Sequence, residues 1–437
     1  MSRPSNYFDR SSFIPKRLAD YIKSRYIFIT TTGNEEIFVY KDGVYIPAES
    51  LIKGLCSNLL GNRATTHRIN ETLNNIKYTT FVDRNEFNKD KHLINLKNGI
   101  FNLEKMKLQP HSPTVIMTNQ LPVVYNPNAD CPKIKDFFYQ IVCAEDVPLL
   151  QEIFGYCLWK DYHIQKAFML IGDGANGKST FLGLLKRFLG TENVSSVSLQ
   201  DLINNRFASA TLFGKIANVY ADLPDLALHK TGVFKMLTGG DIVPAEKKFK
   251  DMFTFVNFAK LLFSTNKIPE TRDSSVAFFR RWILINFPFK FEDENCDTHI
   301  LDKLTTEEEL SGLFNWSIEG LKRLLNNGHF SNNLTTEEIQ ITYERMSSSV
   351  AAFAKDCLEV ESGGIISKAE LYQKYIEYCQ KNKLPEKASN IFARDLPQYI
   401  SVEAQKRTIN GVSSIPCWIG IKYKDGDTSN SSGGWVI

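Results

Sequence analysis

One segment, residues 167–189, constrains the fold of this chain more than any other. An apolar run, AFMLI, leads through the glycine-rich stretch GDGANGKST into the helix-like pattern FLGLLKRFL. Its spacing matches G-x-x-x-x-G-K-S/T, in which glycines let successive backbone N–H groups converge and a following helix adds partial positive charge. Phe181, Leu184, Leu185 and Phe188 recur at helical spacing and would dock that helix on a sheet. The segment predicts a strand, a phosphate-binding loop and a helix within an α/β domain.

The loop residues predict a nucleotide site that uses ATP and Mg²⁺. Lys178 is expected to reach the β- and γ-phosphates, and the Ser179 hydroxyl to ligate Mg²⁺. The alternative, a chance glycine-rich turn, is disfavoured because a strand and a helix pattern flank the loop. The predicted nucleotide-binding residues are Gly172, Asp173, Gly174, Ala175, Asn176, Gly177, Lys178, Ser179 and Thr180.

Three further apolar runs follow, at residues 215–222, 259–266 and 281–287. Their apolar residues are consecutive rather than alternating, which is typical of strands covered on both faces in a largely parallel sheet. Together with the first run they predict an α/β core.

Polar residues at the ends of two runs are candidates for the chemistry. Asp222 ends the run at residues 215–222 and is assigned to binding Mg²⁺. Asp225 is a candidate for orienting or deprotonating the attacking water, with a turn or helix cap after Pro224 as the alternative. Asn266 ends the next run, where its amide could contact the γ-phosphate or the water, or simply cap a turn.

Two arginines, Arg280 and Arg281, precede the last run. An arginine facing a neighbouring subunit can offset transition-state charge on the phosphates. A surface ion pair is the alternative, and the sequence does not distinguish which arginine would act.

A lysine-rich hairpin is predicted between Asp222 and Asn266, with residues 242–249 pairing with residues 253–258. Lys247, Lys248 and Lys250 would then crowd its tip beside Phe249. Basic side chains contact the phosphates of single-stranded nucleic acid and aromatic side chains stack on its bases. The alternative is that the hairpin is only a solvated, lysine-rich surface element, which is more common.

The chain is expected to divide into a mixed α+β N-terminal domain (1–145), a core (146–335), a C-terminal domain (345–424) and a disordered tail (425–437). Thr305 and Ser367 are predicted helix caps. Asn410-Gly411 predicts a hairpin, so the C-terminal order of helix, helix and hairpin is that of a winged helix. Candidate phosphate contacts there are Arg394, Lys406 and Arg407, which could equally be surface charges.

The composition excludes several classes of protein but identifies no function. The net charge of +3 is too small to indicate nucleic-acid binding without local clusters. Eight cysteines without a C-x-x-C pair indicate neither a metal site nor a disulfide framework. No run approaches 18 apolar residues, so a cytoplasmic protein without a membrane span is expected.

The order of these motifs resembles that of the superfamily 3 helicases, an AAA+ branch of small viruses, phages and plasmids. The resemblance rests on residues 172–179, Asp222, the TGGD run at 238–241 with the lysines after it, Asn266 and Arg280-Arg281. Among these helicases, the phage and poxvirus primase-helicases are the most similar. The resemblance implies a P-loop AAA+ motor in a hexameric ring, with DNA in the channel and ATP between subunits. It implies single-stranded and forked DNA as partners, and possible work beside a separate primase or polymerase.

Two features depart from that family. Leu223 follows Asp222 where many relatives carry a second acid, which leaves the water-activating residue open. The first 145 residues show neither zinc ligands nor an acidic catalytic pair, so primase activity is not expected. The principal hypothesis is an ATP-dependent DNA helicase of a virus, phage, plasmid or other mobile element. An ATP-switched replication initiator is the alternative, and a small-molecule kinase ranks last because it gives the hairpin and C-terminal domain no role.

Overall fold

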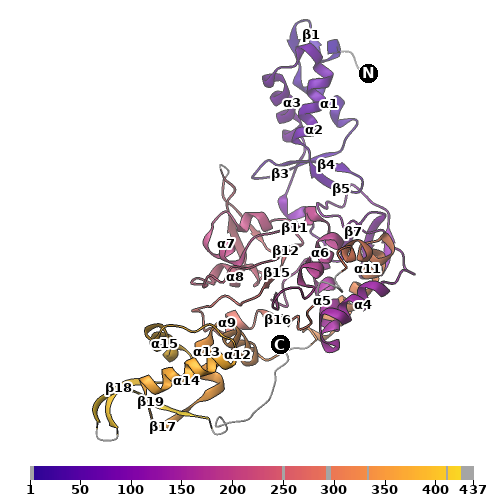
Figure 1. Cartoon of the computed structure of the whole chain (residues 1–437). Helices are drawn as coiled ribbons and strands as arrows, with labels where there is room; N and C mark the ends of the chain where they lie inside the picture. The colour runs from indigo at the N-terminus through magenta and orange to yellow at the C-terminus, as the bar shows by residue number, and fades with distance from the viewer. Residues whose placement is uncertain (1–3, 249–250, 292–296, 332–333, 410–411, 425–437) are drawn as a thin grey trace.

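The structure is a computed structural model that describes residues 4–248, 251–291, 297–331, 334–409 and 412–424. An N-terminal lobe, a central body and a C-terminal domain follow one another along the long axis of the molecule (Figure 1).

The central body is built on a five-stranded sheet in which every pairing is parallel. The strands, in spatial order, are β11 (Val194–Ser195), β12 (Ala217–Tyr220), β15 (Lys260–Thr265), β10 (Ala167–Ile171) and β16 (Trp282–Asn286). The four apolar runs identified in the sequence are thus confirmed as parallel strands. The short edge strand β11 was not predicted.

Both faces of the sheet are covered, which explains why its strands are apolar at consecutive positions. In β10, Phe168 and Leu170 enter one buried cluster, while Ala167, Met169 and Ile171 enter another. The first cluster is covered by α4 (Pro132–Ile141), α5 (Val147–Leu158), α6 (Lys178–Leu189), α10 (Ile300–Leu304) and α11 (Glu307–Asn327). The second is covered by α7 (Leu199–Asn204), α8 (Gly232–Leu237), α9 (Val276–Phe279) and α12 (Thr336–Ser347).

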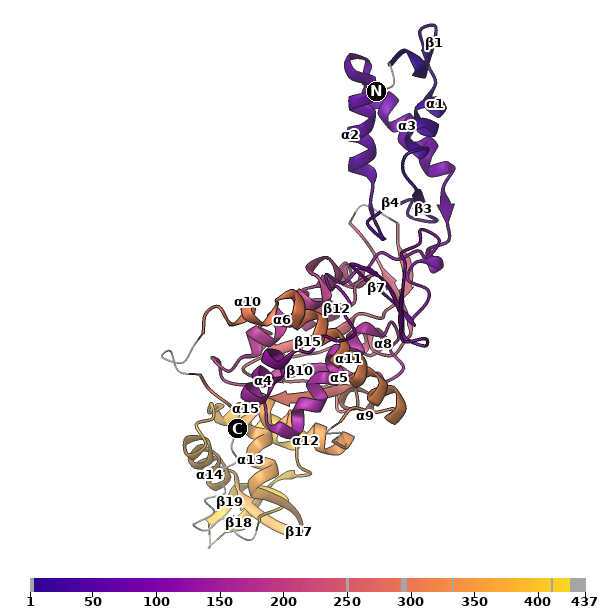
Figure 2. The same ribbon diagram turned by 90° about the vertical axis from the view of Figure 1, so that its right-hand side faces the viewer.

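The N-terminal lobe has a core of its own, made from residues between Tyr7 and Ile76. Its elements are η1 (Pro4–Tyr7), β1 (Phe8–Asp9), β2 (Ser12–Phe13), α1 (Pro15–Lys23), β3 (Phe28–Thr31), β4 (Ile37–Lys41), β5 (Val44–Pro47), α2 (Glu49–Leu60), η2 (Gly61–Arg63), α3 (Thr66–Tyr78) and β6 (Phe81–Val82). The sheet β5-β4-β3-β6 lies next to the central body and the three helices extend away from it (Figures 1 and 2).

The chain between the lobe and α4 packs with the central body. It holds the antiparallel strands β7 (Leu93–Leu96), β8 (Gly99–Asn102) and β9 (Lys107–Gln109). Ile94, Leu96 and Phe101 belong to the same buried cluster as α5 and α11. Residues 1–145, expected as one N-terminal unit, therefore contribute to three separate buried clusters, a division that the sequence pattern did not reveal.

The C-terminal domain is joined to the body through α12, whose Tyr343 packs on Phe278 and Trp282. It comprises α13 (Ser349–Cys357), β17 (Leu358–Ser367), α14 (Lys368–Lys381), α15 (Ser389–Asp395), η8 (Leu396–Gln398), β18 (Glu403–Ile409) and β19 (Val412–Tyr423). The hairpin β18–β19 is confirmed, and β17 adds an unpredicted third strand beside β19. The turn residues Asn410-Gly411 and the tail 425–437 lie outside the described residues.

The predicted helix caps are confirmed in one case and displaced in the other. Ser367 accepts a hydrogen bond from the Glu370 N–H at the start of α14. The cap of α11 is Thr306 rather than Thr305, because the Thr306 side chain accepts from the Glu309 N–H. Among the described residues, no helix is long and apolar enough to cross a membrane.

Candidate active site

A cavity of about 500 Å³ opens at the carboxyl edge of the parallel sheet. Because β15 lies between β10 and β12, Asn266 after β15 is placed between the loop after β10 and Asp222 after β12. The cavity is lined by Phe137, Gln140, Gly174, Ala175, Asn176, Gly177, Lys178, Ser179, Thr180, Ala221, Asp222, Ser264, Asn266, Phe291, Asp297 and Ile300. Three motifs far apart in sequence thus share one cavity of a volume that small-molecule sites commonly have.

The glycine loop, residues 172–177, curls through left-handed backbone conformations. Gly174, Ala175 and Gly177 have φ of 105°, 49° and 85°. This succession of backbone conformations turns consecutive N–H groups toward one side of the loop. The backbone is strained at Ala175, because a residue with a Cβ atom disfavours positive φ. The Phe291 N–H donates to the Ala175 carbonyl at 2.8 Å and ties the loop to the chain after β16.

Lys178 begins α6 and is almost fully buried, with 6% of its surface exposed. Its Nζ donates to the Gly172 carbonyl at 2.5 Å, to Asn176 Oδ1 at 3.1 Å and to Asn266 Oδ1 at 3.4 Å. Burial lowers the pKa of Lys178, while the charges of Asp173 and Asp222 act in the opposite direction. The ammonium group is therefore held at the cavity by oxygen acceptors that an anionic ligand could replace.

Two side-chain oxygens at the cavity suit a hard divalent cation. Ser179 and Asp222 both line it, and Mg²⁺ is bound in proteins through hydroxyl and carboxylate oxygens together with water and substrate phosphates. The described residues contain no group of three or more His, Cys, Asp or Glu side chains that could hold a metal by themselves. A cation here would therefore need ligands from a bound phosphate and from water.

Asp225 lies away from the cavity lining. Its carboxylate is 69% exposed and faces Lys267 Nζ at 3.9 Å. The loop that carries it is held by Gln200, whose amide donates to the Pro224 carbonyl at 2.9 Å and the Leu226 carbonyl at 3.1 Å. In this conformation the geometry favours the turn interpretation over the water-activating one.

The two arginines before β16 occupy different environments. Arg281 is 6% exposed; its Nε donates to Thr238 Oγ1 at 2.9 Å and its terminal nitrogen to the Ala277 carbonyl. Arg280 has an exposed side chain, while its carbonyl accepts from Lys166 Nζ at 2.7 Å. Both precede β16, so they lie a strand length, about 16 Å, from the carboxyl edge where the cavity opens. Neither arginine lines the cavity.

The predicted hairpin is present, with β13 (Ile242–Ala245) paired to β14 (Phe253–Val256). Its tip is tied to the N-terminal lobe, because Lys247 Nζ lies 2.5 Å from Glu36 Oε1 on the β3–β4 connection. Lys248 is exposed, and Phe249 and Lys250 lie outside the described residues. No sequence pattern indicated that Lys247 would pair with another part of its own chain.

Arg84 reinforces this junction between lobe and hairpin. Its guanidinium lies over the Phe253 ring at 4.6 Å and the Phe213 ring at 5.2 Å. Burial lowers the pKa of Arg84 and Glu36 acts against that shift. The Glu36 carboxylate thus interacts with Lys247 of the hairpin and with the charge of Arg84.

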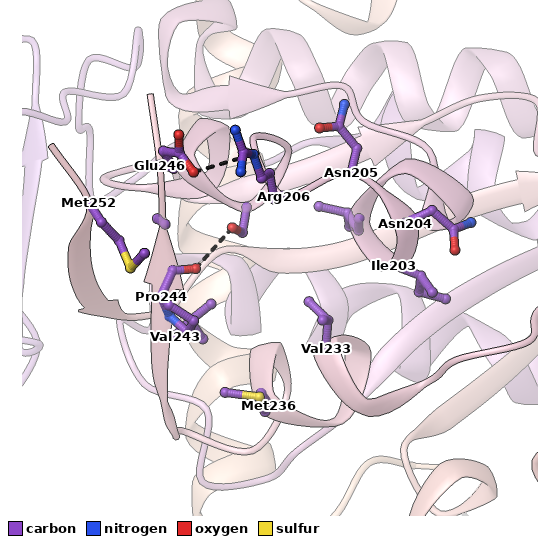
Figure 3. Close-up of a pocket in the computed structure, with 13 residues that line it drawn as sticks. Ile203, Asn204, Asn205, Arg206, Val233, Met236, Val243, Pro244, Glu246 and Met252 are labelled. Carbon is purple, nitrogen blue, oxygen red and sulfur yellow. Dashed lines mark hydrogen bonds and ion pairs between the residues drawn. The ribbon is translucent and has the colours of Figure 1, made fainter. Parts of the chain in front are cut away.

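The hairpin also borders a second cavity, of about 410 Å³ (Figure 3). Val243 and Pro244 of β13 face Ile203, Val233 and Met236 across it. At its rim, Arg206 Nε lies 3.4 Å from Glu246 Oε2. The hairpin is therefore packed against the body through a partly hollow apolar layer.

The candidate phosphate contacts of the C-terminal domain are exposed. Arg394 on α15 is 70% exposed and its Nε donates to the adjacent Asp395 at 2.9 Å. Lys406 and Arg407 lie on β18 with exposed side chains. Asp395 and Glu270 both pair with Lys387, which connects this domain to the loop after β15.

Several cavity residues were missed from the sequence because they lie outside recognisable motifs. Phe137 and Gln140 come from α4, and Phe291, Asp297 and Ile300 come from the segment after β16. No local pattern marks them, since they reach the cavity only through packing of α4 and α10 on α6.

Comparisons with known proteins match three successive parts of the chain. Residues 16–143 match the family described as D5 N terminal like, and residues 345–431 match the family described as Poxvirus D5 protein-like. Residues 170–281, which hold the glycine loop and the hairpin, match a family of unknown function, DUF5906.

One similar curated protein comes from Acanthamoeba polyphaga mimivirus and is named as a putative helicase. It is 25% identical to this chain over 215 residues, which is 46% of the chain. The match spans only 22% of the relative's own length, about a fifth.

Two apo structures of the NrS-1 C-terminal region are also similar. They give TM-scores of 0.49 and 0.47 at 11% and 13% identity, covering 93% of this chain and 99% of each of theirs. A likeness at this level gives no information about function. The segments at both ends thus match D5-related families, and the one curated relative described above is named as a putative helicase.

Proposed function

We propose that this chain is an ATP-hydrolysing DNA helicase motor that serves the replication of a virus, phage, plasmid or other mobile element. The observation that carries the proposal is the single cavity formed by the glycine loop, Asp222 and Asn266 at the ends of three adjacent strands. The relationship to D5-type proteins supports replication as the setting.

In the proposed reaction, the loop N–H groups and Lys178 bind the phosphates of ATP, and Ser179 and Asp222 hold Mg²⁺. Mg²⁺ would offset the negative charge on the phosphates. The contact between Asn266 and Lys178 supports a role for the Asn266 amide in orienting the terminal phosphate or the attacking water. No base is assigned, because the candidate Asp225 is not among the residues that line the cavity.

The arginines support a ring of the AAA+, superfamily 3 type. Arg280 is exposed and lies at the amino edge of the sheet, so it would serve the nucleotide of a neighbouring subunit. A closed ring, with a hexamer as the expected form, provides that geometry. Arg281 is assigned to positioning residues 238–241 within its own subunit, because its guanidinium is bonded there.

DNA engagement is assigned to the hairpin and, secondarily, to the C-terminal domain. The hairpin lysines would contact the strand in the ring channel. The topology of the C-terminal domain, with three strands in the order β17-β19-β18 and two helices between β17 and β18, supports a winged helix. Single-stranded and forked DNA are the proposed substrates, with a separate primase or polymerase as a possible partner and the host cytoplasm as the setting.

The Lys247–Glu36 ion pair favours a second candidate, an ATP-switched replication initiator. A hairpin lysine that stays paired with the lobe cannot contact DNA, so ATP would control assembly rather than movement along a strand. Strand displacement on a forked substrate separates the candidates: a helicase unwinds it with ATP, and an initiator binds it without unwinding.

The nucleotide assignment is tested by Lys178→Ala, with Lys186→Ala on the same helix as the matched control. Loss of the ammonium group should abolish ATP hydrolysis and unwinding, and thermal denaturation should show that the fold is kept. Lys186 does not line the cavity, so its variant should hydrolyse ATP normally. Normal turnover by Lys178→Ala would refute the assignment.

A further inference from the structure

Strand β1 lies at the outer end of the N-terminal lobe, the end farthest from the central body (Figures 1 and 2). Five basic residues belong to β1's turn or to segments that begin near it in the chain or contact it through Phe8. They come from the β1–β2 turn, the first turn of α1, η2 and the first turn of α3. We call this group the basic tip; its members are Arg10, Lys16, Arg17, Arg63 and Arg68.

Contacts to Phe8 hold three of these arginines together. Arg63 lies over the Phe8 ring at 4.8 Å and Arg68 at 5.2 Å. Arg17 donates to the Phe8 carbonyl at 3.2 Å, and Arg68 donates to the Arg63 carbonyl at 2.7 Å. A cation–π contact uses the face of a guanidinium and leaves its N–H edges for other acceptors.

Within the parts of the chain that the structure describes, no member of the basic tip forms an ion pair with a carboxylate. Elsewhere on the same lobe, Lys23 pairs with Asp20 at 3.1 Å and Lys53 with Glu49 at 2.7 Å. The nearest acids in sequence are Asp9, beside Arg10, Asp20, which pairs with Lys23, and Glu71, which faces His67 at 3.3 Å. Five cations against three acids, two of which face other basic side chains, leave a local positive excess.

From this arrangement we propose that the basic tip binds the phosphate backbone of duplex DNA. Guanidinium and ammonium groups bind phosphates through charge-assisted hydrogen bonds and counterion release. Single-strand sites usually add exposed aromatic rings on which bases stack, but Phe8 is 7% exposed and lies beneath two guanidinium groups. Phe13, next to Phe8, is half-buried with Arg68 over its ring at 5.9 Å. Among the described residues the tip therefore offers charge without a fully exposed aromatic ring, which favours the duplex.

The binding should be independent of base sequence. The tip consists of a short hairpin, whose two strands have two residues each, and of helix ends. It has no long helix that could enter a DNA groove and read base edges, so its contacts would be to phosphates. In the proposed motor, the lobe would hold the duplex near the ring. The contact itself needs no ATP, so it can succeed or fail apart from the nucleotide assignment.

The test measures binding of the full chain to a fluorescent duplex of about 20 base pairs without nucleotide, from about 50 to 200 mM salt. Arg10→Gln with Lys16→Gln removes two exposed cations that make no contact with Phe8. We expect at least about a tenfold loss of affinity and a salt slope smaller by about two. Lys41→Gln with Lys53→Gln, which removes the same charge elsewhere on the lobe, should change neither.

Thermal denaturation of both double variants should match the wild type, because all four side chains are exposed. Unchanged affinity and salt slope in the tip variant would overturn the proposal. A tip-dependent preference for single-stranded DNA over the duplex would also overturn it, since it would require a stacking surface. An equal loss in the control variant would show a nonspecific effect of charge and reject the assigned location.

Discussion

Replacement of the two adjacent arginines should separate stability from catalysis. Arg281 makes buried hydrogen bonds to Thr238 and Ala277, and bonds to a charged donor contribute about 1.5–3 kcal/mol each. Arg281→Ala should therefore lower the free energy of unfolding by roughly 3 kcal/mol. Arg281→Met, which keeps the apolar stem, should recover part of the loss. Arg280→Ala removes an exposed side chain and should change stability by less than about 0.5 kcal/mol.

The rate of ATP hydrolysis should fall more in Arg280→Ala than the stability does. If Arg280 serves the neighbouring nucleotide, Arg280→Ala should slow ATP hydrolysis by about 10³-fold or more, even in fully assembled rings. Urea denaturation measures the first effect, and ATPase assays at ring-forming concentrations measure the second. Mixing Arg280→Ala with Lys178→Ala subunits should restore part of the activity, because some interfaces then carry both intact groups. Wild-type turnover by Arg280→Ala, or wild-type stability of Arg281→Ala, would refute the reasoning.

Three further predictions concern the hairpin and a buried lysine. Lys248→Ala with Lys250→Ala should reduce unwinding and DNA-stimulated ATPase far more than basal ATPase; equal stimulation by DNA would argue against the hairpin. Glu36→Gln should release Lys247 and raise affinity for single-stranded DNA, whereas unchanged binding would show that the ion pair does not restrain the hairpin. Burial lowers the pKa of Lys260 from its ordinary 10.5 to about 7, so between these values the unfolded chain binds the extra proton and stability rises with pH. Lys260→Met should reduce that slope, by at most about 1.4 kcal/mol per pH unit, in urea titrations at two pH values; an unchanged slope would contradict it.

Four of the five strands of the central sheet, and helix α6, could be predicted because their signals are local. Consecutive apolar residues in β10 reflect its two covered faces, and the helical spacing of Phe181 and Leu185 reflects one docked face. The hairpins at residues 242–256 and 403–423 were predicted in the same way. The cap of α11 was displaced by one residue because Thr305 and Thr306 are adjacent and only backbone geometry selects between them.

The sequence by itself determined which chemistry this chain could carry: a glycine loop with Lys178 and Ser179, two strand-terminal polar residues, and an arginine pair. Local spacing suffices for these, since each depends on a few neighbouring residues. Only the tertiary structure decided which of them lie together. Strand order placed Asn266 between Lys178 and Asp222, packing buried Arg281 and exposed Arg280, and Asp225 turned toward Lys267. The pairing of Lys247 with Glu36, 211 positions away in sequence, depends on chain reversal over long distances, which no local pattern encodes.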